Sequence, residues 1–351
     1  MAYAFNNVLM AGLALAGGAA AAAYAQNVAA PKPAAAQSAE IGSGKSTSAI
    51  DDQVLQDQVM LDVAGFPAGV IDGKKGMSFK KAVQGFQESR GLPKTGEVDA
   101  ATRQALQTGR QATRDLKLGP EVFEGPFTNP FPKKAQDQAK LSFLGYRNQL
   151  ERLAEMFHTT PDTIIALNGP DKIIRQGEIL KLPNVLPRSR DYGGKLKADY
   201  AKWFNALNVD ANQAQGDHVV VDKSEGVLKV LDAGNKLIAQ FPVTMGSSHD
   251  PLPLGNWKAT TYSFLPPFNY QPDLFWDVAD TKAAQRLPPG PNGPVGVAWL
   301  DLTKENYGIH GTNAPETIGR AESHGCIRMT NWDVLRLSRM MKPGFKAVFQ
   351  A

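Results

Sequence analysis

The sequence contains a single cysteine in 351 residues, and this scarcity excludes an internal disulfide framework. After the first 25 residues no segment approaches the run of about 18 apolar residues that a membrane-spanning helix requires, so no integral span is expected in the mature chain. The net charge is only +4, and no basic cluster is interleaved with aromatic residues, so nucleic acid is not an expected partner. No His, Cys and carboxylate grouping has zinc-ligand spacing, and no metal cofactor is expected.

The one cysteine lies among residues that can carry chemistry. The segment Ile-His-Gly-Thr at 309–312 is followed by Ser-His-Gly-Cys-Ile-Arg-Met at 323–329. A thiolate is a strong nucleophile and a neutral imidazole can take its proton, so Cys with His is the minimum set for acyl transfer through a thioester. His324 stands two residues before Cys326, whereas His310 reaches it only if the chain folds back. The pattern indicates a cysteine acyltransferase or hydrolase site.

The residues after the cysteine predict a helix. Thr330 is typical of an N-cap, with Asp333 at the third helical position, and Pro343-Gly344 ends the apolar helical spacing. Cys326 would then stand just ahead of a helix. We therefore expect backbone N–H groups at the helix start to lower the thiol pKa or stabilise an oxyanion.

These two segments resemble the signature of the L,D-transpeptidases with a YkuD-type catalytic domain. The resemblance continues through the Pro-rich segments 250–257 and 287–296. It implies Cys326 as nucleophile and His310 as general acid/base, with the Gly311 carbonyl orienting the imidazole. It further implies an oxyanion region shaped by His324 and Gly325. The substrate-binding residues that it implies are Ser323, Thr312 and Arg328, and a surface salt bridge stays open as the alternative for Arg328.

The resemblance also implies the reaction and its partners. In this family the cysteine attacks the carbonyl of the third residue of a peptidoglycan stem peptide and expels the terminal D-alanine. The thioester then passes to the amine of another stem, giving a 3→3 cross-link, to a lipoprotein lysine, or to water. No organic cofactor is implied. An L,D-carboxypeptidase on the same fold and a non-catalytic wall-binding protein remain open as alternatives.

The first 50 residues predict export. Residues 1–25 have the apolar character of a signal peptide, and Ala23-Tyr24-Ala25 fits a small-x-small cleavage site. Cleavage and retention both remain open because no Lys or Arg precedes the apolar run. Residues 26–50 are an Ala, Pro, Ser and Gly linker that cannot bury a core. A periplasmic, wall-associated protein is the expectation.

Two small modules are expected before the catalytic domain. Residues 51–109 resemble the all-α peptidoglycan-binding domain 1 family, in which Phe79 and Phe86 are interpreted as core rather than as a ligand platform. Residues 141–184, with Thr160-Pro161 as a helix start, resemble an α+β LysM module that binds glycan strands. Segments 110–140 and 185–216 are expected to be linkers. The modules would tether the chain to the wall while the chemistry resides after Asp217.

Residues 217–351 predict a mainly-β catalytic domain. Apolar alternation predicts short strands at 219–221, 227–231 and 237–241, with a turn at 232–235 between the last two. The resemblance implies a β-sandwich-like fold with a helix after the cysteine. The Pro- and aromatic-rich stretch 264–276 is interpreted either as a lid over the site or as packing on the sheet. The whole chain is thus expected to be a multidomain protein.

Overall fold

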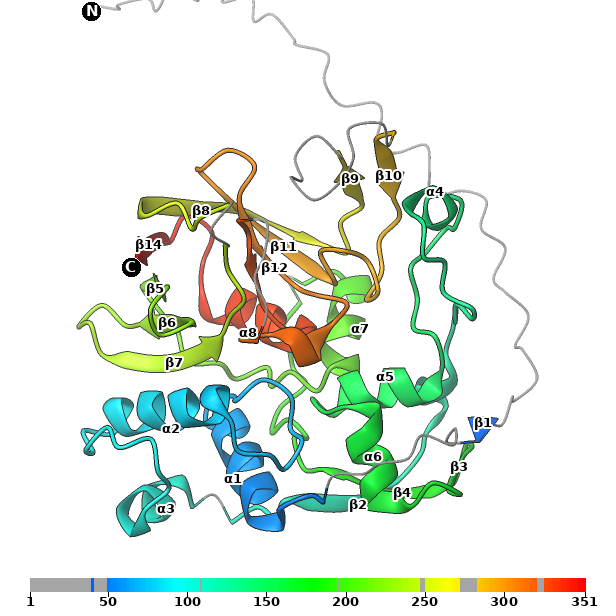
Figure 1. Cartoon of the computed structure of the whole chain (residues 1–351), viewed down its shortest axis with the longest axis horizontal. Coiled ribbons are helices and arrows are strands. Elements are labelled where there is room, and N and C mark those ends of the chain that lie inside the picture. The colour runs from blue at the N-terminus through cyan, green and yellow to red at the C-terminus, as the bar shows by residue number, and fades with distance from the viewer. Residues whose placement is uncertain are drawn as a thin grey trace, which may run out of the picture. The chain divides into compact units, whose positions relative to one another are not determined.

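A computed structural model describes residues 39–40, 49–107, 109–194, 196–246, 250–271, 283–320 and 325–351 (Figure 1). The expected signal peptide at 1–25 and most of the linker at 26–50 lie outside the described residues, as do Ser323 and His324. No helix in the described part has the length and apolar character that crossing a membrane requires.

Residues 51–107 form a helical region. Its helices are α1 (Asp52–Val63), α2 (Met77–Ser89) and α3 (Ala100–Leu106). The Asp51 side chain caps α1 by accepting the backbone N–H groups of Gln53 and Val54 at 2.9 and 3.0 Å. Phe79 and Phe86 are only 6% and 1% exposed inside this region, which confirms the prediction that they are core residues.

Residues 113–183 form two helices with a two-stranded ribbon. The strands β2 (Thr113–Lys117) and β4 (Ile179–Pro183) pair antiparallel, with α5 (Gln149–Met156) and α6 (Pro161–Asn168) between them in sequence. The predicted helix start is confirmed, because Thr160 Oγ1 accepts the Thr163 N–H at 3.2 Å. A short strand β3 (Ile173–Ile174) pairs with β1 (Ala39–Glu40).

The segment 110–140, expected as a linker, contains regular structure. It holds β2 together with the 3-10 helix η1 (Pro120–Phe123) and the short helix α4 (Ala135–Gln138). The strand reads Thr-Arg-Asp-Leu-Lys and has one apolar residue, so no alternation revealed it. It is held by pairing to β4 rather than by its own pattern.

An eight-stranded mixed sheet organises the remaining chain, in the order β13-β12-β11-β8-β14-β5-β6-β7. Its strands are β5 (His218–Asp222), β6 (Val227–Leu231), β7 (Leu237–Pro242), β8 (Gly255–Phe264), β11 (Ala298–Leu302), β12 (Gly308–His310), β13 (Ile327–Arg328) and β14 (Lys346–Gln350). The predicted first three strands are confirmed, and they pair antiparallel in sequence order. In the turn between β6 and β7, Asp232 Oδ1 accepts the Gly234 and Lys236 N–H groups at 2.9 Å.

The sheet is one curled layer rather than the expected β-sandwich-like pair. The ten-residue strand β8 makes the difference, because its first half pairs with β14 and its second half with β11. The pairing of β8 with β11 shifts register between Leu300 and Leu302, which is where a bulge increases local twist. An alternating sequence pattern predicts single strands, but it does not show that one long strand pairs with two different neighbours.

Two helices complete the core of this sheet. Helix α8 (Asn331–Met340) contacts β11 and β12 (Figure 1). Its residues Trp332, Val334, Leu335 and Leu337 are fully buried. The predicted cap is confirmed, because Thr330 Oγ1 accepts the Asp333 N–H at 3.2 Å. Helix α7 (Ala198–Ala206) lies in the segment 185–216 that was expected as a linker, and Phe204 belongs to the same core.

Buried polar contacts join the helical regions to the sheet domain. Asp62 on α1 accepts two hydrogen bonds from the Arg336 guanidinium on α8, at 3.0 and 2.6 Å. Gln240 on β7 donates to the Lys81 carbonyl of α2 at 2.8 Å. Contacts of this kind are expected inside one folded unit, whereas tethered modules on flexible linkers would leave these groups in water.

Candidate active site

The strands β12 and β13 bring His310 and Cys326 to one place. They pair in parallel, with Ile309 opposite Ile327 and His310 opposite Arg328. Both isoleucines are buried in the core of the sheet. Because successive side chains on a strand alternate between faces, His310 and Arg328 point to the opposite side, as does Cys326 two residues before Arg328. The chain thus folds back so that the distant histidine lies beside the cysteine segment.

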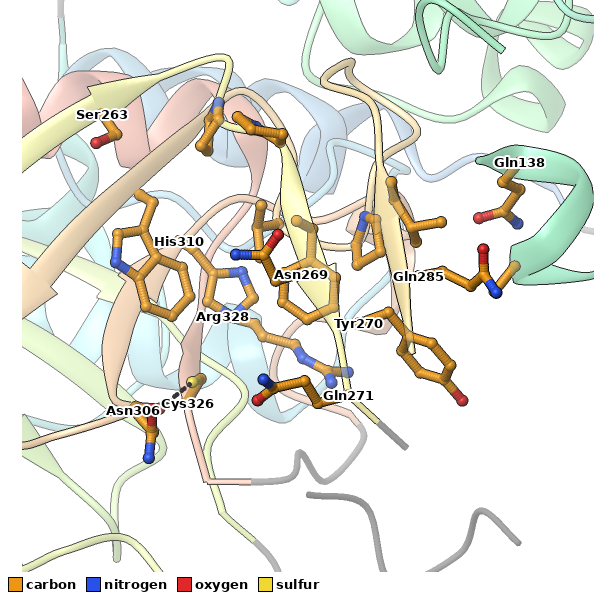
Figure 2. Close-up of a pocket in the computed structure, with 18 of the residues that line it drawn as sticks. Gln138, Ser263, Asn269, Tyr270, Gln271, Gln285, Asn306, His310, Cys326 and Arg328 are labelled. Carbon is orange, nitrogen blue, oxygen red and sulfur yellow. Dashed lines mark hydrogen bonds between the residues drawn. The ribbon is translucent and has the colours of Figure 1, made fainter. Parts of the chain in front are cut away.

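These side chains line a pocket of about 1420 Å³. Figure 2 shows His310, Arg328 and Cys326 together at one end, while Tyr270 and Gln285 lie farther along. The outer wall consists of β9 (Phe268–Tyr270), β10 (Gln285–Leu287) and α4. Within the stretch 264–276, Phe264 packs against α7, residues 266–271 line the pocket, and 272–276 lie outside the described residues.

The His310 ring is held in one tautomer. Its Nδ1 lies 2.7 Å from the Gly311 carbonyl oxygen, and its ring stacks on Trp299 with centroids 5.2 Å apart at 15°. Burial and, to a smaller extent, the Arg328 charge lower the pKa of His310 to about 3, and the Gly311 hydrogen bond opposes them only in part. The ring is therefore neutral at physiological pH. Since a carbonyl only accepts, Nδ1 carries the proton and Nε2 is left as a proton acceptor.

The Cys326 thiol is half-buried, and its Sγ lies 3.7 Å from the Asn306 carbonyl oxygen. Burial raises the pKa of Cys326, and a backbone hydrogen bond from Gly308 and the Arg328 charge only partly offset this. Of the two roles expected for the following helix, a lowered thiol pKa is not seen in this net direction, and stabilisation of an oxyanion stays a prediction. Strand β13 intervenes, and α8 begins at Asn331. The resting site combines a neutral thiol with a neutral imidazole.

Gly325 and Tyr307 form a close contact beside the cysteine. Gly325 has φ of +102°, and a Cβ there would lie 2.9 Å from Cε1 and from the hydroxyl of Tyr307. Both the backbone conformation and the space require glycine. Burial raises the pKa of Tyr307, with smaller contributions from Cys326 and Asp250. Sequence reasoning missed Tyr307 and Trp299, although two aromatic residues within eleven positions of His310 were a usable signal.

The remaining predicted site residues differ in their placement. Arg328 lines the pocket, and its Nε is buried without a hydrogen-bond partner among the described residues. Burial lowers its pKa, although a guanidinium remains a cation at physiological pH. Gly311 and Thr312 are buried and do not line the pocket among the described residues, and Thr312 Oγ1 accepts the Ala314 N–H at 3.2 Å. Ser323 and His324 lie outside the described residues.

Comparison with known proteins finds a family match for two segments of the chain. Residues 216–349 match the YkuD family, described as "L,D-transpeptidase catalytic domain", and residues 51–106 match the family described as "Putative peptidoglycan binding domain". The "Putative L,D-transpeptidase YkuD" of Bacillus licheniformis is 57% identical over 56 residues, which are 16% of this chain and 34% of that protein. The "Putative L,D-transpeptidase YqjB" of Bacillus subtilis is 28% identical over 143 residues, which are 39% of this chain and 73% of that protein.

These curated relatives and one solved structure match the chain over part of their length. The chain spans about a third of the length of the first two curated relatives it matches. An L,D-transpeptidase from Mycobacterium smegmatis superposes with a TM-score of 0.32 at 19% identity, covering 38% of this chain and 58% of that one. The family matches to two separate segments are the firmer finding. The chain therefore carries a catalytic domain of the L,D-transpeptidase family and, before it, a domain of a peptidoglycan-binding family.

Proposed function

We propose that this chain cross-links peptidoglycan stem peptides by L,D-transpeptidation, with Cys326 as nucleophile and His310 as general acid/base. One observation carries the proposal. Adjacent parallel strands deliver the only thiol of the chain and a neutral imidazole, fixed by Gly311, to the same end of a large pocket. A base with its Nδ1 proton committed to a carbonyl has its Nε2 lone pair available for the thiol proton.

The first half-reaction forms a thioester. His310 Nε2 takes the Sγ–H proton of Cys326 as sulfur attacks the carbonyl of the third stem residue. The tetrahedral oxyanion collapses, the C–N bond to the terminal D-alanine breaks, and the imidazolium returns its proton to the leaving amine. Because the resting pair is neutral, charge develops only as the reaction proceeds, where the pocket can stabilise it. In this proposal Gly325 and His324 shape the oxyanion region.

The second half-reaction transfers the acyl group. An acceptor amine attacks the thioester carbonyl while His310 Nε2 takes its proton, the C–S bond breaks, and the proton returns to sulfur. The side-chain amine of a second stem as acceptor gives a 3→3 cross-link, and a lipoprotein lysine would give a protein–wall bond. Water as acceptor would make the chain an L,D-carboxypeptidase. No nucleotide is consumed, because one amide replaces another.

The charges of the pocket support an anionic substrate. Its lining includes Lys133, Lys134, Lys304 and Arg328 against the two acids Asp250 and Glu305. Stem peptides carry free carboxylates, and a cleft with an excess of one charge concentrates ligands of the other. Arg328 is assigned to a substrate carboxylate because its buried Nε has no partner among the described residues. Thr312 and Ser323 complete the proposed substrate-binding set.

The earlier regions are assigned to wall binding and export. We infer that residues 51–106 bind peptidoglycan, as their family description suggests. Helices α5 and α6 followed by strand β4 support a LysM-like interpretation of residues 141–184, with glycan strands as ligand, although the partner of β4, strand β2, lies in the segment expected as a linker. Residues 1–25 are assigned to a signal peptide, which would place the protein in the periplasm.

Incubation of the purified protein with tetrapeptide muropeptides, followed by mass spectrometry, tests this proposal. Cross-linked dimers are expected. Tripeptides alone would indicate the carboxypeptidase, and unchanged substrate would indicate a non-catalytic wall-binding protein. The control is Cys326→Ala, which should be inert while it keeps the thermal midpoint of the parent. Activity that survived in this variant would exclude the cysteine mechanism.

The two histidines can be separated by the same chemistry. His310→Ala should lose nearly all acyl-enzyme formation with a chromophoric β-lactam, because it removes the proton acceptor. His324→Ala should retain measurable acylation, because the proposal places His324 in the oxyanion region and leaves the role of proton acceptor to His310. The reverse result would exchange their roles.

A further inference from the structure

The region that precedes the sheet domain reaches the wall of the active site. The Leu144 N–H donates to the Pro289 carbonyl at 2.8 Å, and the Asn292 N–H donates to the Leu144 carbonyl at 3.0 Å. A Cβ on Gly290 would lie 2.2 Å from the Leu144 oxygen, so only glycine allows this approach. The segment 289–296 is thus held by residues 144–145 on one side, and on the other a Cβ on Gly296 would lie 2.8 Å from the backbone of Gly311 and Thr312.

Asn331 lies at the centre of this contact. It is the first residue of α8 and is completely buried. Its Oδ1 accepts the Val297 N–H at 3.1 Å, and its Nδ2 donates to Glu155 Oε1 at 2.6 Å and to the Pro291 carbonyl at 3.3 Å. Every hydrogen-bonding position of this amide except one acceptor lone pair is therefore used.

The same amide presses against the backbone that orients His310. A Cβ on Gly311 would lie 2.1 Å from Asn331 Oδ1, and a Cβ on Gly296 would lie 1.9 Å from it. Two glycines therefore close around one amide oxygen. Gly311 is also the residue whose carbonyl accepts the His310 Nδ1 proton at 2.7 Å. A shift of the Asn331 side chain would move the acceptor that sets the imidazole orientation.

Glu155 comes from α5, far from the catalytic motif in sequence, and is itself fixed. Its Oε2 accepts the Tyr146 hydroxyl at 2.5 Å, while Oε1 accepts Asn331. Burial raises the pKa of Glu155 to about 8, and no cation pairs with it among the described residues. A buried acid without a cation is expensive for the fold. Its two hydrogen bonds connect the α5 region to Asn331 beside the active site.

We propose that Asn331 and Glu155 are positioning residues, which hold the Gly311 carbonyl and thereby aim His310 Nε2 at Cys326. The proposal rests on the role of His310 as the base in the proposed function. It assigns the region of residues 144–155 a part in catalysis, beyond any attachment to the cell wall. The action is indirect, since neither side chain lines the pocket among the described residues.

The single thiol of the chain gives a direct test in the full protein. The rate of Cys326 alkylation by iodoacetamide, measured from pH 5 to 10, reports thiolate formation without any peptidoglycan substrate. We expect Asn331→Ala to lower this rate at pH 7 by about tenfold or more, because misplacement by about 1 Å can cost 10²-fold. The midpoint of the pH profile should move upward.

A matched control separates positioning from stability. Asn208 is also a buried asparagine, and its Nδ2 donates to the Met156 carbonyl at 2.7 Å. Its φ of +48° adds strain for alanine, so Asn208→Ala should lower the thermal midpoint at least as much as Asn331→Ala. We expect Asn208→Ala to leave the alkylation profile unchanged. Equal changes in both variants would overturn the positioning role.

An exchange of the two partners tests the hydrogen bond itself. Asn331→Asp alone places two carboxyl groups against each other, and we expect it to slow alkylation at neutral pH. Adding Glu155→Gln places a side-chain amide donor opposite the new carboxylate at position 331. The double variant should therefore recover most of the lost alkylation rate. Glu155→Gln alone should stay near the parent, because the glutamine oxygen still accepts from Asn331. Absence of recovery in the double variant would contradict the proposal.

A His310→Ala variant keeps the two proposals distinguishable. If it slows alkylation while Asn331→Ala does not, only the positioning role fails. If His310→Ala leaves the profile unchanged, the base role fails, and the positioning role fails with it. Slowing by both variants, with no further loss when they are combined, is the result that we expect.

Discussion

Two buried histidines in this protein stack on tryptophans, and their surroundings differ in one respect. His158 stacks on Trp332 with centroids 4.9 Å apart, and both of its ring nitrogens are engaged, Nδ1 with Asp62 at 3.2 Å and Nε2 with the Leu207 carbonyl at 2.8 Å. His310 stacks on Trp299, and within the described residues only its Nδ1 has a hydrogen-bond partner, the Gly311 carbonyl. A fully satisfied ring stabilises the fold, whereas a ring with one uncommitted nitrogen facing a pocket can move protons.

Their neighbouring arginines show the same contrast. Although burial opposes it, pairing with Asp62 and Asp333 raises the pKa of Arg336, which keeps that guanidinium charged and bound. Arg328 lines the pocket, and its Nε has no partner among the described residues. Buried ion pairs cost desolvation and specify the arrangement of segments, while an unpaired cation in a pocket is available to a ligand. Hydrogen-bond satisfaction distinguishes the two places better than residue type does.

The largest expected effect separates the two histidines. His310→Ala should lower acylation of Cys326 by about 10²–10⁴-fold, the usual contribution of a general base, with little change in thermal midpoint. His158→Ala should lower the free energy of unfolding by about 1–3 kcal/mol, because it leaves the Leu207 carbonyl unsatisfied. Its acylation rate per folded molecule should be unchanged. Stopped-flow acylation together with urea denaturation measures both, and a catalytic loss in His158→Ala would break the comparison.

Removing Asp62 tests the satisfied cluster. Asp62→Ala leaves Arg336 buried without its main partner, and we expect a loss of about 3–5 kcal/mol in unfolding free energy at pH 7. Although burial alone would raise it, Arg336 and His158 lower the pKa of Asp62 below its ordinary value of 3.8. Its stabilisation is therefore present above that pH and is lost as the pH falls through the lowered value. At pH 2 to 3 the difference between parent and variant should shrink, and a constant difference would contradict the assignment.

Glu155 should respond to pH in the opposite direction. Burial raises its pKa from 4.5 to about 8, so the folded state holds a proton that the unfolded state has released. The stability of the parent should therefore fall as the pH rises from about 4.5 through about 8. Glu155→Gln removes this dependence, and it should gain on the parent by about 1 kcal/mol or more between pH 5 and pH 9. Parallel stability curves from chemical denaturation would argue against a buried acid.

The smallest expected effect concerns the stacked tryptophans. Trp299→Phe keeps an aromatic surface against His310, and since such pairs contribute about 0.5–1.5 kcal/mol, acylation should fall by less than about tenfold. The completely buried Trp332 should behave differently, because Trp332→Phe leaves a cavity against His158 and lowers the melting temperature instead. Activity loss in the second variant but not the first would reverse the assignment of the two rings.

The sequence predicted the parts of this structure that depend on local patterns. The strands at 218–242, the Thr330 cap and the convergence of His310 with the cysteine segment follow from alternation, capping chemistry and a spaced motif. The segments 110–140 and 185–216, expected as linkers, contain elements that no local pattern predicted. Strand β2 has one apolar residue and α7 is nine residues long, so each is held by contacts distant in the chain.

The candidate site was predictable to the same extent. The chemistry-bearing residues stand in the motif, but the residues that surround them come from elsewhere. Trp299 and Tyr307 belong to a neighbouring strand and its following turn, while Glu155 belongs to α5. A raised pKa of Cys326 also ran against expectation, because its cause is burial by residues that no local window contains. Contacts that join distant segments set the electrostatics.

Helix α8 carries Asn331 at its start and Arg336 one and a half turns later, and these residues bond to Glu155 and Asp62 on two other helices. Helix α8 therefore couples the local unfolding of α1 and of α5 to that of the sheet domain. Opening of α1 or α5 would leave a buried partner on α8 unpaired, so their slowest amides should exchange together through one cooperative unfolding event. A calorimetric scan should then show a single transition, because the domains predicted along the sequence would unfold together rather than independently.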